Sequence, residues 1–401
     1  MCVFEPLLKR FFIYMKFYEQ LGSFRLNISS PEEARLREEL KKKNDADSMR
    51  LTRFLALPDL TRIPGHPVYE VVKRIFAIQE FENFDHIQVP EIVRADQSFD
   101  LFNFPPNHPA RSASDTYFVN NEYILRTHTT IMWYYYVKSK EIQERIKNNQ
   151  SLGSLSYGKV YRKDEIDRFH LNVFHQIDGW YLHPTSDKIV PFDELKNILG
   201  KIAKAIFGED VKFRFNEDTF PYTDPSVEME IERNGQWIEV LGGGMVRPVV
   251  LEKLGVDPKQ YTGWAFGFGA ERLAIVSMEL PDIRLLRSED PRVIKQLVLG
   301  NKYKEVSKFP PITRDISFVV GKDFFVNQYY DVIRDIGGDL VEEVQLLDKY
   351  EDEKKFGPNR VSYTFRAVYR ASDRTLVSEE VDKIQDKLYK ETASQFRAEL
   401  R

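Results

Sequence analysis

Residues 263–276 read Gly263-Trp264-Ala265-Phe266-Gly267-Phe268-Gly269-Ala270-Glu271-Arg272-Leu273-Ala274-Ile275-Val276. Small and large apolar residues alternate up to Gly269, which is the period of a β-strand. Beyond that point the apolar residues follow helical spacing, so Glu271 and Arg272 fall in the first turn of a helix. An arginine held there can bind a phosphate with its rigid, always-charged guanidinium. An ordinary surface ion pair between the two residues is the alternative.

The composition of the chain limits the classes of protein to consider. Its 401 residues suffice for two or three domains, and 42% hydrophobic with 30% charged residues is typical of a soluble globular protein. No apolar run approaches the roughly 20 residues of a membrane helix, so no membrane contact is expected. Cys2 is the only cysteine, which excludes an internal disulfide and a thiolate zinc site. The net charge of −4 leaves any nucleic-acid contact to local basic surface.

The first 60 residues are the least informative part of the sequence. An apolar segment at residues 11–18 is too short to span a bilayer, and no small-residue cleavage site of a secretory signal follows it. Glu5 and Glu19 argue against a mitochondrial presequence, which is usually poor in acids. Residues 31–49 predict one exposed, charged helix that starts at Pro31.

Two later regions predict a helix–strand unit and a long hairpin. From His66 onward, apolar residues recur at helical spacing, and an extended stretch over residues 84–92 follows. Within residues 157–178, two β-rich runs flank a charged loop, so one hairpin can present Arg162 and His170 to a ligand. A surface hairpin with scattered charges is the alternative. Residues 192–206 predict a further helix.

These stretches resemble the three motifs of the class II aminoacyl-tRNA synthetases. The pattern Gly-Φ-Gly-Φ-Gly-Φ-Glu-Arg, with Φ apolar, resembles motif 3, and the helix and strand before Pro90 resemble motif 1. Arg162-Lys163-Asp164, followed by His170 and Phe174, resembles motif 2. Three segments are similar in sequence to the phenylalanyl-tRNA synthetases, in particular the single-chain mitochondrial type. They are residues 263–274, residues 102–111 and Leu280-Pro281-Asp282-Ile283-Arg284.

The resemblance implies an ATP site formed by motifs 2 and 3. Arg162 is expected to bind the α-phosphate, His170 the outer phosphates and Arg272 the γ-phosphate, which makes these three the candidate catalytic residues. The implied ATP-binding residues are Arg162, Asp164, His170, Phe174 and Arg272, with Phe174 stacked on adenine. Glu239 is a candidate for contact with ATP-bound Mg²⁺, and a salt-bridged strand carboxylate is the alternative. ATP and Mg²⁺ are therefore the expected cofactors.

The resemblance also implies an amino-acid pocket. Its candidate residues are His128, Thr130, Gln176, Asp178, Phe220, Tyr222 and Ala265. In the family, the residues matching His128 and Thr130 hold the substrate, and those matching Gln176 and Asp178 receive its α-amino group. The residues matching Phe220 and Tyr222 clamp its phenyl ring, and a small residue at the place of Ala265 lets the ring reach the bottom of the pocket. Three departures from the family concern the identity of the amino acid: Trp133 replaces a frequent glutamine, Asp178 a glutamate, and Tyr222 a phenylalanine. These departures keep a class II synthetase for another amino acid open.

From residue 303 the pattern changes to strand, helix, strand, strand and helix, an order typical of a ferredoxin-like module. Segments such as Ser307-Lys308-Phe309-Pro310-Pro311 resemble the ferredoxin-fold anticodon-binding domain of mitochondrial phenylalanyl-tRNA synthetases. Arg366 and Arg370 share one strand face by the two-residue period. With Arg374 and Arg314 they are candidates for a phosphate-binding stripe toward tRNA, and a solvated sheet face is the alternative.

The expected fold is α+β: the antiparallel sheet of a class II synthetase flanked by helices, then a C-terminal ferredoxin-like α+β domain. The expected organisation is an N-terminal extension (1–60), a catalytic domain (61–300) and an anticodon-binding domain (303–401). The resemblance implies ATP-dependent formation of phenylalanyl-adenylate and transfer to the 3′-terminal ribose of tRNA(Phe) by a monomer. A non-catalytic tRNA-binding paralogue and a subunit that needs a partner chain are alternatives. The implied location is the mitochondrial matrix, with the cytoplasm as the alternative.

Overall fold

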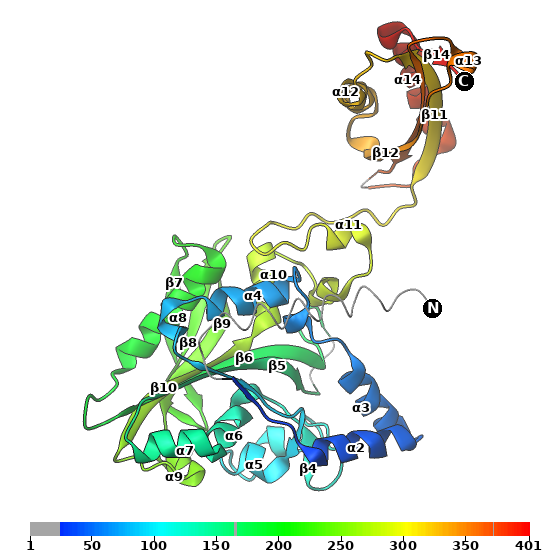
Figure 1. The fold of residues 1–401 in the computed structure, drawn as a ribbon. Helices are drawn as coiled ribbons and strands as arrows, with labels where there is room; N and C mark the ends of the chain where they lie inside the picture. Colours follow the sequence, from blue (N-terminus) through cyan, green and yellow to red (C-terminus); the bar gives the residue numbers. More distant parts are fainter. Residues whose placement is uncertain (1–24, 164–166, 372) are drawn as a thin grey trace. The chain divides into compact units, whose positions relative to one another are not determined.

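The computed structural model describes residues 25–163, 167–371 and 373–401. They form two compact units that divide after Tyr303 (Figure 1). The apolar segment at residues 11–18, with Glu5 and Glu19, lies outside the described residues. Among the helices of the described residues, none is both long enough and apolar enough to cross a bilayer.

The described part of the first unit is built on an eight-stranded sheet in the order β1-β2-β5-β6-β10-β9-β8-β7. The strands are β1 (Arg25–Asn27), β2 (Asp85–Gln88), β5 (Leu152–Tyr161), β6 (Val173–Pro184), β7 (Phe213–Phe220), β8 (Thr223–Arg233), β9 (Gln236–Val246) and β10 (Tyr261–Gly269). Strands β1, β2 and β5 pair in parallel, and the remaining neighbours pair antiparallel. The predicted antiparallel sheet is confirmed, with a short parallel edge. Strands β3 (Ile92–Arg94) and β4 (Tyr123–Leu125) form a separate pair.

Helices cover both faces of this sheet (Figure 1). On one face lie α4 (Pro67–Phe76), α8 (Phe192–Phe207) and α10 (Ala270–Met278), which contact one another. On the other lie α5 (Ala95–Phe99), α6 (Met132–Lys138), α7 (Lys140–Lys147) and α9 (Pro248–Leu254). The helices predicted from His66 and over residues 192–206 are confirmed as α4 and α8. The long hairpin predicted within residues 157–178 is confirmed as β5 and β6.

The single exposed helix predicted over residues 31–49 is wrong. The chain forms α2 (Pro31–Lys42) and α3 (Ala46–Ala56) instead. A new helix starts because the Asp45 side chain accepts a hydrogen bond from the Ser48 backbone N–H at 2.9 Å, which caps α3. Both helices also have a buried side, where Leu36 and Leu51 join a cluster with Tyr161 of β5. The described residues before position 60 are therefore packed onto the large sheet.

Residues 263–276 form β10 and α10, as the change of period predicts. Strand β10 lies inside the sheet, between β6 and β9. Its neighbours approach so closely that side chains are excluded at two places. A Cβ atom on Gly263 would lie 1.8 Å from the Tyr181 carbonyl oxygen, and one on Gly179 would lie 2.2 Å from the Phe266 ring. These glycines are required by packing, not by backbone conformation.

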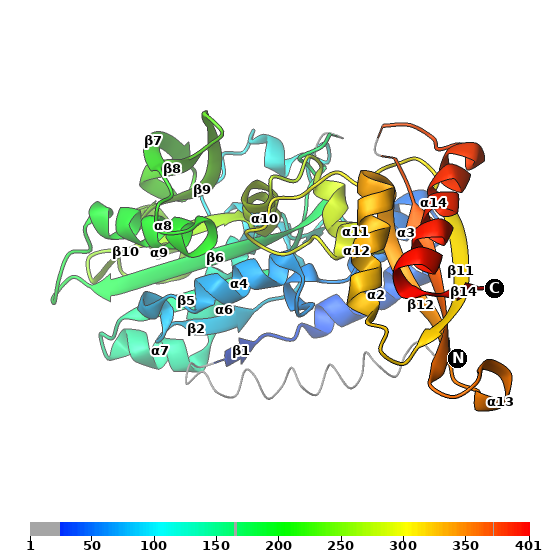
Figure 2. The same cartoon turned by 90° about the horizontal axis from the view of Figure 1, so that it is seen from above.

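The described part of the second unit is a four-stranded antiparallel sheet in the order β12-β13-β11-β14. Its strands are β11 (Ile312–Gly321), β12 (Val341–Tyr350), β13 (Arg360–Tyr369) and β14 (Glu399–Leu400). Helices α12 (Val326–Gly337) and α14 (Ser378–Phe396) lie side by side (Figure 2) and pack on one face, over a core that includes Phe318, Tyr329 and Phe365. The predicted ferredoxin-like element order is confirmed, and β14 is added at its end.

Candidate active site

A cavity of about 640 Å³ lies over the large sheet, and strand register shapes its floor. Glu228 of β8 is opposite Gly242 of β9, which is in turn opposite Gly267 of β10. Gly267 is opposite Asp178 of β6. The two glycines carry no side chains, and a Cβ atom would lie 3.2 Å from the Phe220 ring at Gly242 and 3.2 Å from Asp178 Oδ2 at Gly267. In the next row of the sheet, Ala265 takes the corresponding place on β10.

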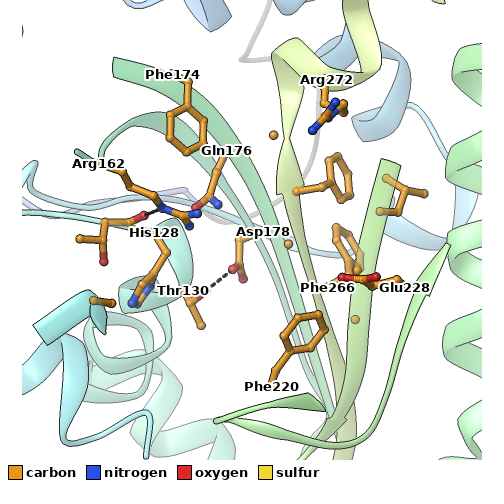
Figure 3. Close-up of a pocket in the computed structure, with 18 of the residues that line it drawn as sticks. His128, Thr130, Arg162, Phe174, Gln176, Asp178, Phe220, Glu228, Phe266 and Arg272 are labelled. Atoms are coloured by element: carbon orange, nitrogen blue, oxygen red, sulfur yellow. Dashed lines mark hydrogen bonds between the residues drawn. The ribbon is translucent and has the colours of Figure 1, made fainter. Parts of the chain in front are cut away.

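Every described candidate for ATP or amino-acid binding lines this one cavity (Figure 3). These residues are His128, Thr130, Arg162, His170, Phe174, Gln176, Asp178, Phe220, Tyr222, Glu239, Ala265 and Arg272. They come from segments that are far apart in the sequence, and several of them are on the neighbouring strands β6 and β10. Asp164, the remaining candidate, lies outside the described residues.

Two arginines reach the cavity from opposite walls (Figure 3). Arg162 follows β5, and its Nε–H donates to the Thr127 carbonyl at 2.9 Å while its guanidinium lies 5.4 Å from the centre of the Phe174 ring. Arg272 stands in the first turn of α10 and forms no ion pair within the described part of the chain. Two cations that never lose their charge suit a polyphosphate ligand.

His170 lies in the loop between β5 and β6, at the rim of the cavity. Asp167 holds it: one carboxylate oxygen lies 2.8 Å from the His170 Nδ1 atom, and the other accepts the His170 backbone N–H at 2.8 Å. The hairpin thus brings both Arg162 and His170 to the same cavity.

Asp178 is the one carboxylic acid among the candidate residues for amino-acid binding. Its Oδ2 accepts the Thr130 hydroxyl at 2.7 Å, and its Oδ1 accepts the indole N–H of Trp133 at 3.1 Å. Burial raises the pKa of Asp178 to about 7, and the two hydrogen bonds only partly oppose this rise. The carboxyl group is therefore balanced between its two charge states near neutral pH, and a bound cation would favour the ionised state.

His128 lies beside this acid as a neutral ring. Burial, followed by the charge of Arg162, lowers the pKa of His128 to about 3. The backbone of Ser98 lies near enough to oppose this fall in pKa, but neither ring nitrogen meets the geometry of a hydrogen bond among the described residues, and the side chain is only 7% exposed. Gln176 accepts the Thr129 backbone N–H at 3.2 Å through its carbonyl oxygen. Buried polar atoms without partners are those that a ligand can satisfy.

Aromatic rings close the other end of the cavity. The rings of Phe220 and Tyr222, at the turn between β7 and β8, are stacked with centres 6.0 Å apart and an interplanar angle of 8°. Tyr222 also meets Trp133 edge-on, with ring centres 6.1 Å apart. Ala265, which is opposite Trp180, contributes only a methyl group to the cavity lining. A flat apolar group matches such walls.

Glu228 is a cavity residue that the sequence reasoning missed. Burial and the charge of Glu239 raise the pKa of Glu228 to about 7, with a further contribution from Asp218. No sequence motif pointed to it, but its alternation with buried residues along β8 could have placed it on the floor. Among the described residues, no cluster of three or more His, Cys, Asp or Glu could hold a metal unaided. Glu228 and Glu239 repel each other, but together with phosphate oxygens they would provide the oxygen ligands that a Mg²⁺ ion prefers.

A second missed group lies beneath the cavity. Glu271 is buried rather than at the surface, so the alternative of a surface ion pair with Arg272 is wrong. Its Oε1 lies 2.6 Å from His175 Nδ1, and its Oε2 accepts the His175 backbone N–H at 2.9 Å. Asp59 Oδ1 lies 3.3 Å from His175 Nε2. The Leu60 backbone N–H also points at Nε2, an interaction of the neutral ring, and is 3.0 Å away.

The two carboxylates decide the charge of His175. Against the cost of burial, Glu271 and Asp59 raise the pKa of His175 to about 9. The pKa of Asp59 is held well below its usual range, although burial opposes this, because of His175 and Arg62. This buried group ties the segment before α4 to β6 and to the first turn of α10. Arg272 and Phe174, which are adjacent to Glu271 and His175, are thereby held on one framework.

In the second unit, the four arginines predicted as one stripe do not share a face. On β11 and β13, Asp315 is opposite Arg366 and Arg314 is opposite Ala367, so Arg314 and Arg366 point to opposite sides. Each arginine has an acidic partner: Arg314 pairs with Asp382, Arg366 with Asp315, Arg370 with Glu342, and Arg374 with Glu380. The single stripe is therefore wrong. Contact of these arginines with tRNA stays a prediction.

Comparison with known proteins matches both units. The family of tRNA synthetases class II core domain (F) matches residues 55–297, and that of the ferredoxin-fold anticodon binding domain matches residues 307–401. The chain is 37% identical to the chloroplastic/mitochondrial phenylalanine–tRNA ligase of Arabidopsis thaliana, over 80% of this chain and 73% of the relative. It is 35% identical to the mitochondrial enzyme of Mus musculus, over 74% and 71%. It is 38% identical to the phenylalanine–tRNA ligase alpha subunit of Alteromonas mediterranea, over 67% and 78%.

These matches confirm the resemblance first drawn from residues 263–276 and from the hairpin motif. The core family covers more than half of the chain, and relatives above 30% identity cover most of it. The protein belongs to the phenylalanine–tRNA ligase family of class II aminoacyl-tRNA synthetases.

Proposed function

We propose that this protein activates phenylalanine with ATP and transfers it to the 3′-terminal ribose of tRNA(Phe). The observation that carries the proposal is that one cavity is lined both by a pair of arginines and by a buried acid with aromatic rings around it. The arginines suit a polyphosphate, and the acid and rings suit an aromatic amino acid. Membership of the family supports the same reaction.

In the first step, a carboxylate oxygen of phenylalanine attacks the α-phosphorus of ATP, and pyrophosphate leaves. No strong protein base is needed, because the attacking group is already an anion. The protein contributes position and charge: Arg162 binds the α-phosphate, His170 the outer phosphates and Arg272 the γ-phosphate. Phe174 stacks on adenine, and Asp164 completes the ATP site. Glu228 and Glu239 would hold Mg²⁺, which supplies further neutralisation of the phosphates when bound.

In the amino-acid pocket, Asp178 and Gln176 receive the α-ammonium group, while His128 and Thr130 hold the rest of the backbone part. Phe220 and Tyr222 flank the phenyl ring. In the second step, a ribose hydroxyl of the tRNA, the 2′-hydroxyl in this family, attacks the carbonyl carbon of the adenylate and AMP leaves. The C-terminal unit binds the anticodon region, and the first unit carries both chemical steps.

Ala265 is expected to set the depth of the phenyl pocket. Changing Ala265 to glycine removes one methyl group beside Trp180, so para-substituted phenylalanines such as para-chlorophenylalanine should become substrates. A difference of one methyl group in an apolar pocket changes the ratio of kcat/KM between two substrates by about 10- to 200-fold. The measurement is pyrophosphate exchange with both amino acids. Unchanged rejection of the chlorinated substrate by an active variant would remove Ala265 from the pocket floor.

The pH dependence of phenylalanine binding should report Asp178. Its pKa of about 7 means that the carboxyl group is neutral below that pH and cannot pair with the substrate ammonium. The kcat/KM for phenylalanine should therefore fall about tenfold per pH unit below 7, while the KM for ATP changes little. Initial rates of pyrophosphate exchange between pH 5.5 and 8.5 give both the kcat/KM for phenylalanine and the KM for ATP. A flat phenylalanine profile would contradict the role of Asp178.

Amino-acid-dependent ATP–pyrophosphate exchange tests the proposed function. The purified chain is screened with all twenty amino acids, and exchange with phenylalanine, but much less with tyrosine, is expected. Exchange with a different amino acid would keep the mechanism and overturn the substrate. Silence with all twenty would support either a non-catalytic tRNA-binding paralogue or a subunit that needs a partner chain.

A second candidate is a subunit that needs a partner chain, which the similarity to a bacterial alpha subunit favours. The anticodon-type unit on the same chain favours an active monomer instead. Sedimentation of the active protein distinguishes the two, since a monomer of 47.2 kDa is expected. The names of the mitochondrial relatives support a location in mitochondria, with the cytoplasm as the alternative.

A further inference from the structure

Trp133 occupies a position at which two parts of the candidate pocket meet. Its side chain is fully buried, and it lines the cavity. The indole N–H donates to Oδ1 of Asp178, a residue 45 positions away. Tryptophan has one hydrogen-bonding group, so this bond uses all of its capacity. The ring therefore shows the cavity an apolar surface only.

The ring of Trp133 is held by its neighbours. It is stacked on Trp180 with centres 5.0 Å apart and an interplanar angle of 6°. It meets Phe102 at 5.5 Å and Tyr222 at 6.1 Å, both edge-on. Tyr222 is one of the two rings that flank the proposed phenyl site. Trp133 thus touches the acid at one end of the pocket and the aromatic wall at the other.

Both oxygens of Asp178 have a donor, and the two donors differ in what they can fix. Thr130 bonds Oδ2 through a hydroxyl that rotates. The indole N–H of Trp133 has a direction set by the stacked ring. A hydrogen bond to a charged group fixes its orientation and stabilises its ionised state. Losing the indole N–H should therefore leave Asp178 less well oriented and less often ionised.

We propose that Trp133 is a positioning residue for amino-acid recognition, whose N–H orients Asp178 toward the substrate ammonium while its ring fixes Tyr222 against the substrate side chain. The inference rests on the proposed function, because it takes the substrate to be an amino acid held by Asp178. It makes recognition of the ammonium group and fit of the side chain depend on one residue.

The test compares two matched variants, Trp133→Phe and Trp180→Phe. Each replaces one indole of the stacked pair by a phenyl ring, so both lose similar packing. Only the first removes a hydrogen bond, since Nε1 of Trp180 has no partner among the described residues. Should Trp133→Phe fail to fold, β-(benzothiophen-3-yl)alanine at position 133 keeps the ring shape and replaces N–H by sulfur.

The KM for phenylalanine should rise about 10- to 100-fold in Trp133→Phe, the range for a hydrogen bond to a charged group. The kcat and the KM for ATP should change little, and the pH below which phenylalanine binding weakens should move upward. In ¹³C NMR of the unliganded protein, Asp178 should titrate at higher pH than in wild type. Trp180→Phe keeps the indole N–H of Trp133 and loses only stacking, so it should change each of these measurements much less than Trp133→Phe.

Three outcomes would overturn the proposal. An unchanged KM and pH profile in folded Trp133→Phe would do so, as would equal effects of both phenylalanine variants, which would indicate packing alone. In either case wild-type exchange with phenylalanine would leave the proposed function standing. Absence of exchange in the wild type with every amino acid would overturn both.

Discussion

Replacement of Arg272 by alanine is expected to abolish adenylate formation in a protein that still folds. The side chain stands in the first turn of α10 and reaches the cavity without an ion partner among the described residues, so its removal breaks no ion pair there. It would remove one of two cations that neutralise ATP as charge builds on the leaving pyrophosphate. Loss of one such preorganised contact costs about 10²- to 10³-fold in kcat, and loss of a full charge on a phosphate at least as much.

Arg272→Lys and Arg284→Ala provide the comparison. Lysine keeps the charge but loses the planar fork, so it should recover part of the activity. Arg284 is exposed and pairs with Asp282, and its removal should leave exchange unchanged. Phenylalanine-dependent pyrophosphate exchange and circular dichroism measure activity and folding. Normal exchange by folded Arg272→Ala would exclude this arginine from the mechanism.

Replacement of Glu271 by alanine should cause the largest loss of stability. It would leave His175, which is fully buried, without its main counter-charge and without the acceptor for its backbone N–H. Breaking a buried ion pair by removing one partner costs about 3–5 kcal/mol. Urea denaturation of the full chain, followed through the transition of the first unit, measures this. Glu252→Ala, an exposed change on α9, should stay within about 0.5 kcal/mol of wild type.

The same pair predicts a pH dependence of stability. The folded-state pKa of His175 is raised to about 9, above the value of about 6.5 in an unfolded chain. The stabilisation is therefore fully present below pH 6.5 and is lost as the pH rises through 9. The gap in the free energy of unfolding between wild type and Glu271→Ala should narrow between pH 7 and 9. A constant gap would mean that His175 is neutral in the folded protein.

Local patterns were enough to predict the elements that carry the site. The change from a two-residue to a helical period at Gly269 predicted β10 and α10, because each period follows from backbone geometry within a few residues. The same reasoning predicted the hairpin of β5 and β6 around Arg162. It failed over residues 31–49, where Asp45 caps a second helix that the charge pattern concealed. The roles expected for the site residues came from the family motifs and stay predictions.

The sequence by itself determined the family, the two α+β units and a set of residues that all reach one cavity where they are described. The tertiary structure alone decided how those residues are paired. Trp133 meets Asp178 across 45 positions, and His175 meets Glu271 across 96. Strand register placed Glu228 on the floor and turned Arg314 away from Arg366. Strand order and register depend on contacts between distant segments, which the local period of side chains does not contain.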